Sequence, residues 1–306
     1  MLICDTHADT LYAMQKPERD KALALDVTLA HLSSPNDVRV QALALFVGTS
    51  GSMEEAAVLV ERELAMLQQL KSEGFRQIVT LSEALPGKAN VLLTIEGGEA
   101  FGADASSVER FAALGVRAAA LVWNHENLLA HPAVGSNPNG LTAFGREICR
   151  RLNSRHIAID ISHLNERGVL DVLESGVPPM ASHSCARALC RHARNLSDRQ
   201  LHALFQAGGY VGVNFYASFL SDSGHANLDT VVDHIAYICD LGGEAHVGLG
   251  SDFDGIDAYP DGLRNAGDLP LLFERMRARG FDEALVHAVA GENFQHYLQQ
   301  LSPSPC

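Results

Sequence analysis

Six histidine and carboxylate residues follow apolar, strand-like runs of the sequence. They are His7, Asp9, Glu96, His163, His183 and Asp252. Imidazole and carboxylate groups suit borderline-soft divalent ions such as zinc. A carboxylate such as that of Glu96 has two oxygens and can bridge two ions. The set therefore predicts a hydrolase that works with two metal ions.

The first two of these residues are separated by a single position. His7 and Asp9 come shortly after the strand-like run 1–4. Residues i and i+2 of an extended backbone face the same side, so we expect these two side chains to grip one ion together. Each residue alone has a plainer interpretation, because an isolated histidine is more often a hydrogen-bonded residue and an aspartate after a strand often caps a helix. The prediction therefore depends on all six residues together, since each of them follows a strand-like run.

Composition narrows the class of protein. The 306 residues, 47% apolar and 20% charged, are enough to bury a sizeable core. The net charge of -14 argues against a nucleic-acid or anionic-membrane partner and favours a small substrate or a cation. Six cysteines without CxxC spacing and the lack of a signal-like N-terminal run predict reduced thiols and a cytosolic location. No apolar segment approaches the roughly 18 residues of a membrane span.

Strand-like runs alternate with helical ones along the chain. The strand-like runs are 1–4, 41–47, 90–95, 116–123, 157–162, 179–182, 210–216 and 246–251. Helical spacing is found at 53–71, 107–114, 142–154, 166–175, 197–206 and 228–241. These units predict one (β/α)8 barrel over 1–301, with extra helices in 269–301 and a frayed tail at 302–306. Catalytic groups of such barrels lie at the C-terminal ends of the strands, where the six residues fall.

Five stretches hold these residues and their neighbours, and a sixth holds Arg194 and Asn195; in order they are 5–11, 95–98, 161–163, 182–184, 194–195 and 250–255. In this order, over nearly the whole chain, they resemble the renal (membrane) dipeptidase family, peptidase family M19, of the amidohydrolase superfamily. The resemblance implies a dipeptidase with two zinc ions. It places His7 and Asp9 on one ion, His163 and His183 on the other, and Glu96 and a water or hydroxide between them.

The resemblance also implies roles outside the ligand set. Asp252 would shuttle the proton, Arg194 would bind the terminal carboxylate of the substrate, and Tyr216 would lie on the substrate side. From the residues alone, Arg194 reads more plainly as a surface residue of a cationic run. Asp160 and Asp254 stay open between partners of the ligands and structural polar groups. The family resemblance further implies a homodimer, although the sequence identifies no interface.

The fourth strand-like run departs from the family pattern where an oxyanion-stabilising histidine is expected. Family members carry that histidine three residues before an asparagine, and anchoring on Asn127 puts Asn124 in its place, with His125 one residue later. Adjacent residues of a strand face opposite sides, so only one of the two can reach the substrate. We assign Asn124 the catalytic position and keep His125 as the competing substrate-side residue.

The sequence thus predicts a cytosolic two-zinc dipeptidase whose partner is a small dipeptide, with neither nucleic acid nor membrane involved. Family members often accept a D-residue at the C-terminal position, so hydrolysis of L,D-dipeptides is a hypothesis. A deaminase or lactonase with the same two-metal site is one alternative. A non-catalytic peptide-binding barrel is another, and the complete ligand set argues against it.

Overall fold

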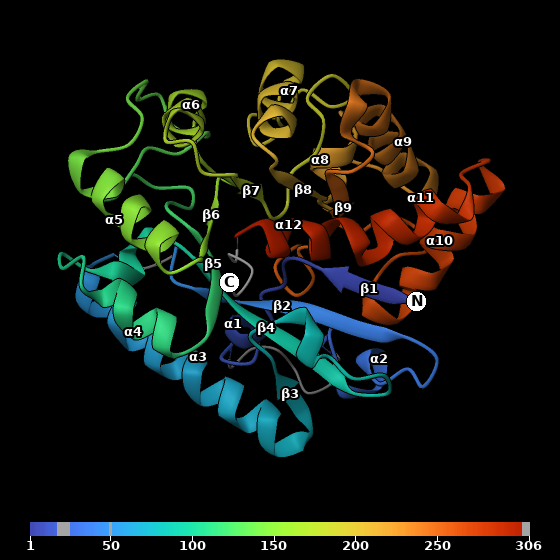
Figure 1. Cartoon of the computed structure of the whole chain (residues 1–306), viewed down its shortest axis with the longest axis horizontal. Helices are drawn as coiled ribbons and strands as arrows, with labels where there is room; N and C mark the ends of the chain where they lie inside the picture. The colour runs from blue at the N-terminus through green and yellow to red at the C-terminus, as the bar shows by residue number, and fades with distance from the viewer. Residues whose placement is uncertain (17–24, 49–50, 302–306) are drawn as a thin grey trace.

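The computed structural model describes residues 1–16, 25–48 and 51–301, and it shows a parallel barrel surrounded by helices (Figure 1). The strands are β1 (Leu2–Asp5), β2 (Val38–Phe46), β3 (Phe75–Gln77), β4 (Ala89–Glu96), β5 (Val116–Ala120), β6 (Ala158–Asp160), β7 (Met180–Ala181), β8 (Tyr210–Val213) and β9 (Val247–Leu249). Their order is β2-β1-β9-β8-β7-β6-β5-β4, and β4 pairs with β2 to close the ring. The predicted (β/α)8 barrel is confirmed, and the tail predicted at 302–306 lies outside the described residues.

All eight predicted strand regions contain a strand, but several strands end earlier than predicted. Strand β6 ends at Asp160 and β7 ends at Ala181, and the backbone N–H groups of Ser162 and Ser182 that follow bond to a side chain. The backbone N–H of Ser182, for example, donates to Oδ1 of Asp160 at 3.0 Å. The short strand β3 was not predicted; it extends the sheet beside the first residues of β4.

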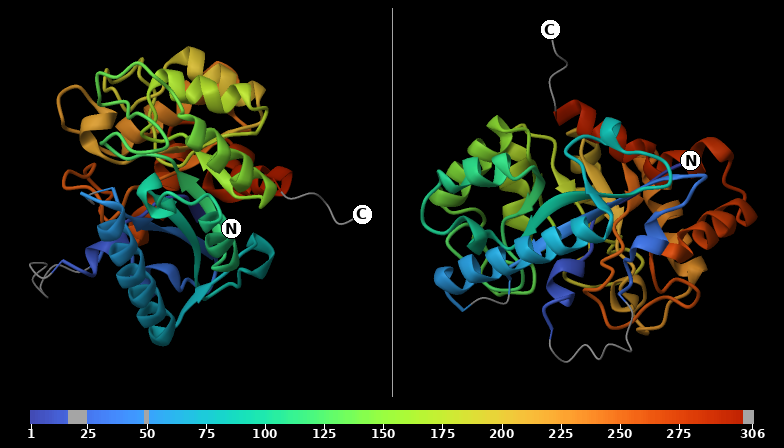
Figure 2. Two further views of the ribbon diagram at one scale, coloured as in Figure 1. Left: turned by 90° about the vertical axis from the view of Figure 1, so that its left-hand side faces the viewer. Right: turned by 90° about the horizontal axis from the view of Figure 1, so that it is seen from below.

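Helices cover the outside and one end of the barrel. They are α1 (Thr10–Ala13), α2 (Leu29–Leu32), α3 (Met53–Glu73), α4 (Ser107–Ala113), α5 (Ala143–Ser154), α6 (Glu166–Glu174), α7 (Asp198–Gln206), α8 (Ala217–Leu220), α9 (Leu228–Ile238), α10 (Leu269–Ala278), α11 (Glu283–His287) and α12 (Asn293–Leu301). The long helix α3 packs against β2 (Figure 2). Its N-cap is Ser52, whose hydroxyl accepts from the backbone N–H of Glu55, and its C-cap is Gly74 with φ of 114°.

The inside of the barrel is filled by buried side chains and is plugged at the N-terminal ends of the strands by α12. Its buried members include Cys4, Val40, Ala42, Leu92, Ala118, Ala158, Met180 and Tyr210 from the strands and Phe294 and Tyr297 from α12. The hydroxyl of Tyr297 donates to the carbonyl of Pro178 at 3.1 Å, and Asn293 Nδ2 donates to the carbonyl of Val247 at 2.8 Å. The six predicted residues follow the other ends of the strands, at the opposite rim of the barrel.

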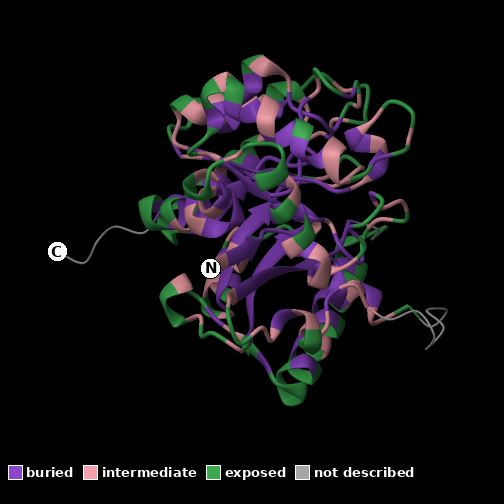
Figure 3. Ribbon diagram, turned by 90° about the vertical axis from the view of Figure 1, so that its right-hand side faces the viewer, coloured by how far each residue is buried: buried purple, intermediate pink, exposed green. Residues whose placement is uncertain are grey.

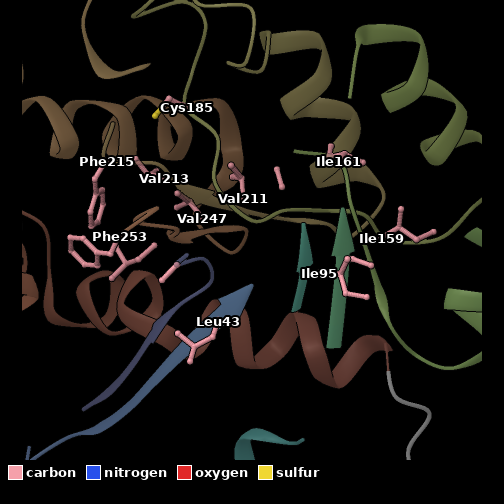
Figure 4. Close-up of a cluster of buried hydrophobic side chains, with 14 of the residues drawn as sticks. Leu43, Ile95, Ile159, Ile161, Cys185, Val211, Val213, Phe215, Val247 and Phe253 are labelled. Carbon is pink, nitrogen blue, oxygen red and sulfur yellow. The ribbon is translucent and has the colours of Figure 1, made fainter. Parts of the chain in front are cut away.

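A second apolar layer lies between the barrel and its helices. Figure 3 shows the strands buried and the outer faces of the helices exposed. Leu43, Ile95, Ile159, Val211 and Val247 point outward into this layer (Figure 4). Residues i and i+1 of a strand face opposite sides, so Ile95 points outward while Glu96 points into the barrel. Within the described ranges, the helices are all too short or too polar to cross a membrane.

Candidate metal centre and substrate cavity

Glu96 lies at the centre of the predicted ligand set. Its Oε1 is 2.8 Å from Nε2 of His163 and 3.4 Å from Nε2 of His183, while its Oε2 is 3.3 Å from Nε2 of His7. The two imidazole nitrogens of His163 and His183 are 3.1 Å apart. The carboxylate therefore presents one oxygen to the His163 and His183 side and the other to the His7 side. This is the arrangement that a bridging carboxylate requires.

His7 also connects Glu96 to two more carboxylates. Its Nε2 is 3.7 Å from Oδ1 of Asp9 and 3.8 Å from Oδ1 of Asp252. The described residues contain two groups whose ligand atoms all lie within 4.8 Å of one another: His7 with Glu96 and His183, and His7 with Asp9 and Asp252. The structure therefore brings all six predicted residues to one place and sets Asp252 among the ligand atoms.

The reason given for pairing His7 with Asp9 was wrong. Strand β1 ends at Asp5, so the two residues are not on an extended strand. Instead Ala8 forms an isolated bridge with Phe253, and Asp9 precedes α1 with φ of -97° and ψ of 26°. The side chains converge because the backbone turns from the barrel rim into a helix.

Asp5 and Asp160, on opposite sides of the site, hold the loops that carry the ligands. Asp160 accepts hydrogen bonds from Ser182 through both its backbone N–H and its hydroxyl. The same hydroxyl is 2.7 Å from Nδ1 of His183, which leaves Nε2 of His183 facing Glu96. Carboxylate support of this kind fixes the tautomer of a ligand histidine. Asp160, whose role the sequence left open, therefore supports the candidate ligand His183 through the hydroxyl of Ser182.

Asp5 makes the equivalent contacts beneath His7. Its Oδ1 accepts from the backbone N–H of Ser251 at 2.8 Å, and its Oδ2 accepts from the hydroxyl of Ser251. That hydroxyl lies 3.1 Å from the carbonyl oxygen of His7. Sequence reasoning did not single out Asp5, although its place at the last position of the first strand is the signal that could have found it.

Asp252 and His163 adopt left-handed backbone conformations, with φ of 65° and 70°. Such conformations are unfavourable for residues other than glycine and tend to occur at functional sites. Asn214 Nδ2 donates to Oδ2 of Asp252 at 2.9 Å, so the other oxygen, Oδ1, is the one that faces His7. The carboxylate is thereby held in one orientation.

Asn124 and His125 lie in different cavities. Asn124 Oδ1 is 3.0 Å from Nδ1 of His163, and Asn124 lines the cavity above the ligands. His125 lines a neighbouring cavity of about 340 Å³ with Glu99 and Glu126. Strand β5 ends at Ala120, so the separation comes from the loop and not from strand alternation as expected.

The cavity above the ligands has a volume of about 510 Å³. Its lining includes Glu96, Asp252, Arg194 and Tyr216. Arg194 is only 4% exposed; its Nη2 donates to the carbonyl of His183 at 3.4 Å, and its Nε has no partner among the described residues. Burial lowers the pKa of its guanidinium, with Glu96 and Asp252 acting in the opposite direction. A buried cation beside the cavity is suited to an anionic substrate group.

The charges of the ligand set favour a bound cation. Burial opposes protonation of His7, yet Glu96, Asp9 and Asp252 raise its pKa to about 10. Burial and the neighbouring Glu96 raise the pKa of Asp9 well above its usual range. Burial also raises the pKa of Asp252, while His7 lowers it. Carboxylates this close repel one another unless a positive charge lies between them.

The pKa values of His163 and His183, on the other side of Glu96, are lowered instead of raised. Burial, together with Arg194, lowers the pKa of His163 to about 4, and burial and His7 lower the pKa of His183 well below its usual range. Both are therefore neutral near pH 7, which is the form that binds metals. The buried atoms His7 Nε2 and Asp9 Oδ1 have no hydrogen-bond partner in the described part of the chain. These unpartnered ligand atoms fit a metal site.

A family model described as membrane dipeptidase, peptidase family M19, matches residues 1–303. The chain belongs to this family. The M19 assignment confirms the resemblance seen in the sequence and makes the chain a member of a family of metal-dependent hydrolases that act on peptide bonds.

Two curated relatives illustrate the similarity. An uncharacterized Klebsiella pneumoniae protein is 38% identical over 218 residues, covering 68% of this chain and 80% of the relative. A dipeptidase of Aspergillus oryzae is 36% identical over 220 residues, covering 70% of this chain and 52% of the relative. This chain thus spans about half the length of the Aspergillus dipeptidase and a larger share of the Klebsiella protein.

Solved structures of M19 proteins superpose on the whole chain. A metallopeptidase from Rhodobacter sphaeroides, liganded with a phosphinate mimic of the dipeptide L-Ala-D-Ala, has a TM-score of 0.89 at 28% identity and covers 99% of both chains. The metallopeptidase dipeptidase AC of family M19 has a TM-score of 0.89 at 29% identity, again with 99% of both chains covered.

Proposed function

We propose that this M19 protein is a dipeptidase that holds two zinc ions and hydrolyses the peptide bond of dipeptides. The observation that carries the proposal is the central place of Glu96, with His163 and His183 at one oxygen and His7 at the other. His7 and Asp9 would hold one ion, and His163 and His183 the other. Ions bound there supply Lewis acidity and lower the pKa of water from about 15.7 to about 7.

Asp252 carries the proton in this proposal. Its Oδ2 is held by Asn214, and its Oδ1 faces the ligand atoms at the floor of the cavity. Oδ1 is placed to accept a proton from the attacking water and to deliver it to the nitrogen of the leaving amine. The carboxylate must be ionised before the reaction begins, which the neighbouring positive charges favour.

Arg194 and Asn124 bind the substrate. The buried guanidinium of Arg194 pairs with the C-terminal carboxylate of the dipeptide and so limits the length of peptide that fits. The side-chain oxygen of Asn124 accepts from Nδ1 of His163, which leaves its Nδ2 group as a donor toward the cavity. That donor would stabilise the oxyanion of the tetrahedral intermediate. Tyr216 forms part of the wall near Arg194, while His125 lies in the adjacent cavity.

The function is tested by measuring metal content and dipeptide turnover on the same samples. We expect two zinc ions per chain and hydrolysis in the wild type, and both ions without turnover in Asp252→Asn. Protein that keeps its metal but hydrolyses no amide would support the alternative of a non-catalytic peptide-binding barrel. Turnover of cyclic amides, lactones or amino-heterocycles but not of dipeptides would support the deaminase or lactonase alternative.

We further propose that the substrates include L,D-dipeptides. The support is the Rhodobacter sphaeroides metallopeptidase, whose ligand mimics L-Ala-D-Ala and whose fold matches this chain over 99% of its length. A panel of L,L and L,D pairs with the same side chains tests this point. Release from the L,L set alone would contradict it.

We also propose that the protein is cytosolic and that it forms a homodimer. Five cysteines of the described residues, Cys4, Cys149, Cys185, Cys190 and Cys239, are free and buried, which fits a reducing compartment. Cell fractionation tests the location, and light scattering of the purified protein tests the oligomeric state.

A further inference from the structure

We propose that Tyr12, Phe46 and Trp123 form an aromatic wall that selects dipeptides with a large apolar or aromatic N-terminal residue. The inference rests on the proposed dipeptidase function and adds a substrate class to it. Tyr12 belongs to α1, Phe46 ends β2 and Trp123 lies in the loop after β5, and all three line the cavity of about 510 Å³. None of these three side chains of the aromatic wall was predicted as a site residue.

The three rings touch in sequence. The ring centroids of Tyr12 and Phe46 are 4.9 Å apart at an interplanar angle of 83°, and those of Phe46 and Trp123 are 5.2 Å apart at 77°. Edge-to-face contacts of this kind are favourable and fix the orientation of each ring. The wall is therefore a preorganised apolar surface, which loses little entropy when a side chain packs on it.

The wall starts beside the metal ligands and depends on a glycine. The ring centroid of Trp123 is 6.2 Å from that of His163. A Cβ atom at Gly48 would lie 2.4 Å from Cβ and 2.6 Å from Cγ of Trp123. The glycine thus leaves the space that lets the indole sit against the end of β2, where it lines the cavity.

The order of the strands puts the wall opposite Arg194. Tyr12 follows β1, Phe46 ends β2 and Trp123 follows β5, whereas Arg194 follows β7. In the ring, β1, β2, β4 and β5 form one half and β6, β7, β8 and β9 form the other. Phe219, whose ring lies 5.6 Å from the guanidinium carbon of Arg194, belongs to the same half as Arg194.

This arrangement determines which side chain of a dipeptide meets the wall. With the C-terminal carboxylate at Arg194 and the scissile carbonyl above Glu96, the N-terminal residue lies on the side of Tyr12, Phe46 and Trp123. Packing a large apolar side chain on such a surface, compared with a methyl group, is worth about a tenfold gain in kcat/KM or more. Phe-Ala should therefore be a better substrate than Ala-Ala, whereas Ala-Phe gains nothing from the wall.

Trp123 reports directly on the contact, because it is the only tryptophan in the 306 residues. Asp252→Asn protein loaded with zinc is titrated with Phe-Ala and with Ala-Ala, and the emission of the indole is recorded. We expect a shift or quenching of the emission with Phe-Ala at least several times larger than with Ala-Ala. Equal responses to the two dipeptides at saturation would overturn the inference.

Kinetics provide the second measurement. The ratio of kcat/KM for Phe-Ala to that for Ala-Ala should be about ten or more in the wild type and should fall toward one in Trp123→Ala. Tyr12→Leu, at a partly exposed position of the same wall, repeats the test if the tryptophan variant does not fold. Phe219→Leu, on the Arg194 side, is the matched control and should leave the ratio unchanged.

The outcomes separate this inference from the proposed function. If the zinc-loaded wild type hydrolyses no dipeptide, the dipeptidase proposal fails and the substrate class fails with it. If dipeptides are hydrolysed but the wild-type ratio is near one, only the aromatic wall is wrong as a specificity surface. A loss confined to Ala-Phe in Trp123→Ala would show that the wall receives the C-terminal residue, which also overturns the inference.

Discussion

Asn124 Oδ1 lies 3.0 Å from Nδ1 of His163, on the side of the imidazole away from Glu96. One amide thus contacts a proposed metal ligand and lines the cavity where the substrate would lie. Removal of such a hydrogen bond to a ligand histidine typically lowers metal affinity by about 10- to 100-fold.

We expect Asn124→Ala and Asn124→Asp to differ in zinc affinity but both to lower kcat. The alanine variant loses both the acceptor for His163 and the donor toward the substrate, so zinc affinity falls about 10- to 100-fold and kcat falls as well. The aspartate variant keeps an acceptor and loses the donor, so zinc affinity is retained while kcat falls about a hundredfold. Competition with a chromogenic chelator measures the first quantity and initial rates at saturating zinc the second. Full activity in the aspartate variant would remove Asn124 from the proposed mechanism.

Arg194→Ala should raise KM for dipeptides with a free C-terminal carboxylate by about tenfold or more, because the charge-assisted pair is lost. Dipeptide amides lack that carboxylate and serve as the matched control, so their KM should be the same for the variant and the wild type. Arg194→Lys should recover only part of the effect, since an ammonium cannot make the two parallel hydrogen bonds. An equal rise in KM for free dipeptides and for dipeptide amides would point to a structural role for the buried guanidinium.

Removal of metal should lower both activity and stability. Asp9, Glu96 and Asp252 repel one another when no cation lies between them, and ligands that bind only the folded state stabilise it. We expect a chelator to abolish turnover and to lower Tm by roughly 5 °C or more, and added zinc to restore both. Calorimetry of the chelated protein measures this Tm. Asp9→Asn, which removes one of the three carboxylates and so reduces their repulsion, is measured beside it. A Tm unchanged by chelation would contradict the electrostatic argument.

Glu63 should make stability depend on pH. This fully buried residue of α3 accepts from the backbone N–H of Phe46 at 2.6 Å and from Gln15 Nε2 at 3.2 Å. Burial, together with Asp9 and Glu96, raises its pKa from 4.5 to about 9 against these hydrogen bonds. Between these two values the unfolded chain has lost the proton and the folded protein has kept it. Stability therefore falls as pH rises, by up to about 1.4 kcal/mol per pH unit.

Glu63→Gln tests this effect because glutamine is uncharged, has the same shape and keeps an acceptor for Phe46. The free energies of unfolding of variant and wild type should be similar near pH 5, and the variant should gain on the wild type up to pH 8. Urea unfolding at fixed zinc concentration measures the difference. Parallel pH curves for the two proteins would mean that Glu63 is ionised in the folded state.

Much of this protein can be read from its sequence, because periodicity and chemistry are local. The alternation of strand-like and helical runs predicted the barrel, and the position of Glu96 at the end of a strand predicted its place at the rim. Strand ends were less predictable. Where the strands end, side-chain bonds such as that from Ser182 to Asp160 join positions far apart in the chain.

The sequence by itself determined the fold class and the family, and it predicted the six residues that meet at one rim of the barrel, since each depends on residue type and on spacing along the chain. Only the tertiary structure decided that Asn124 contacts His163 while His125 lies in another cavity, and that Tyr12, Phe46 and Trp123 meet in one wall. Those relationships depend on how the loops turn after the strands end. Loop paths are set by contacts between distant segments, as at Gly48 and Trp123, which no local pattern records.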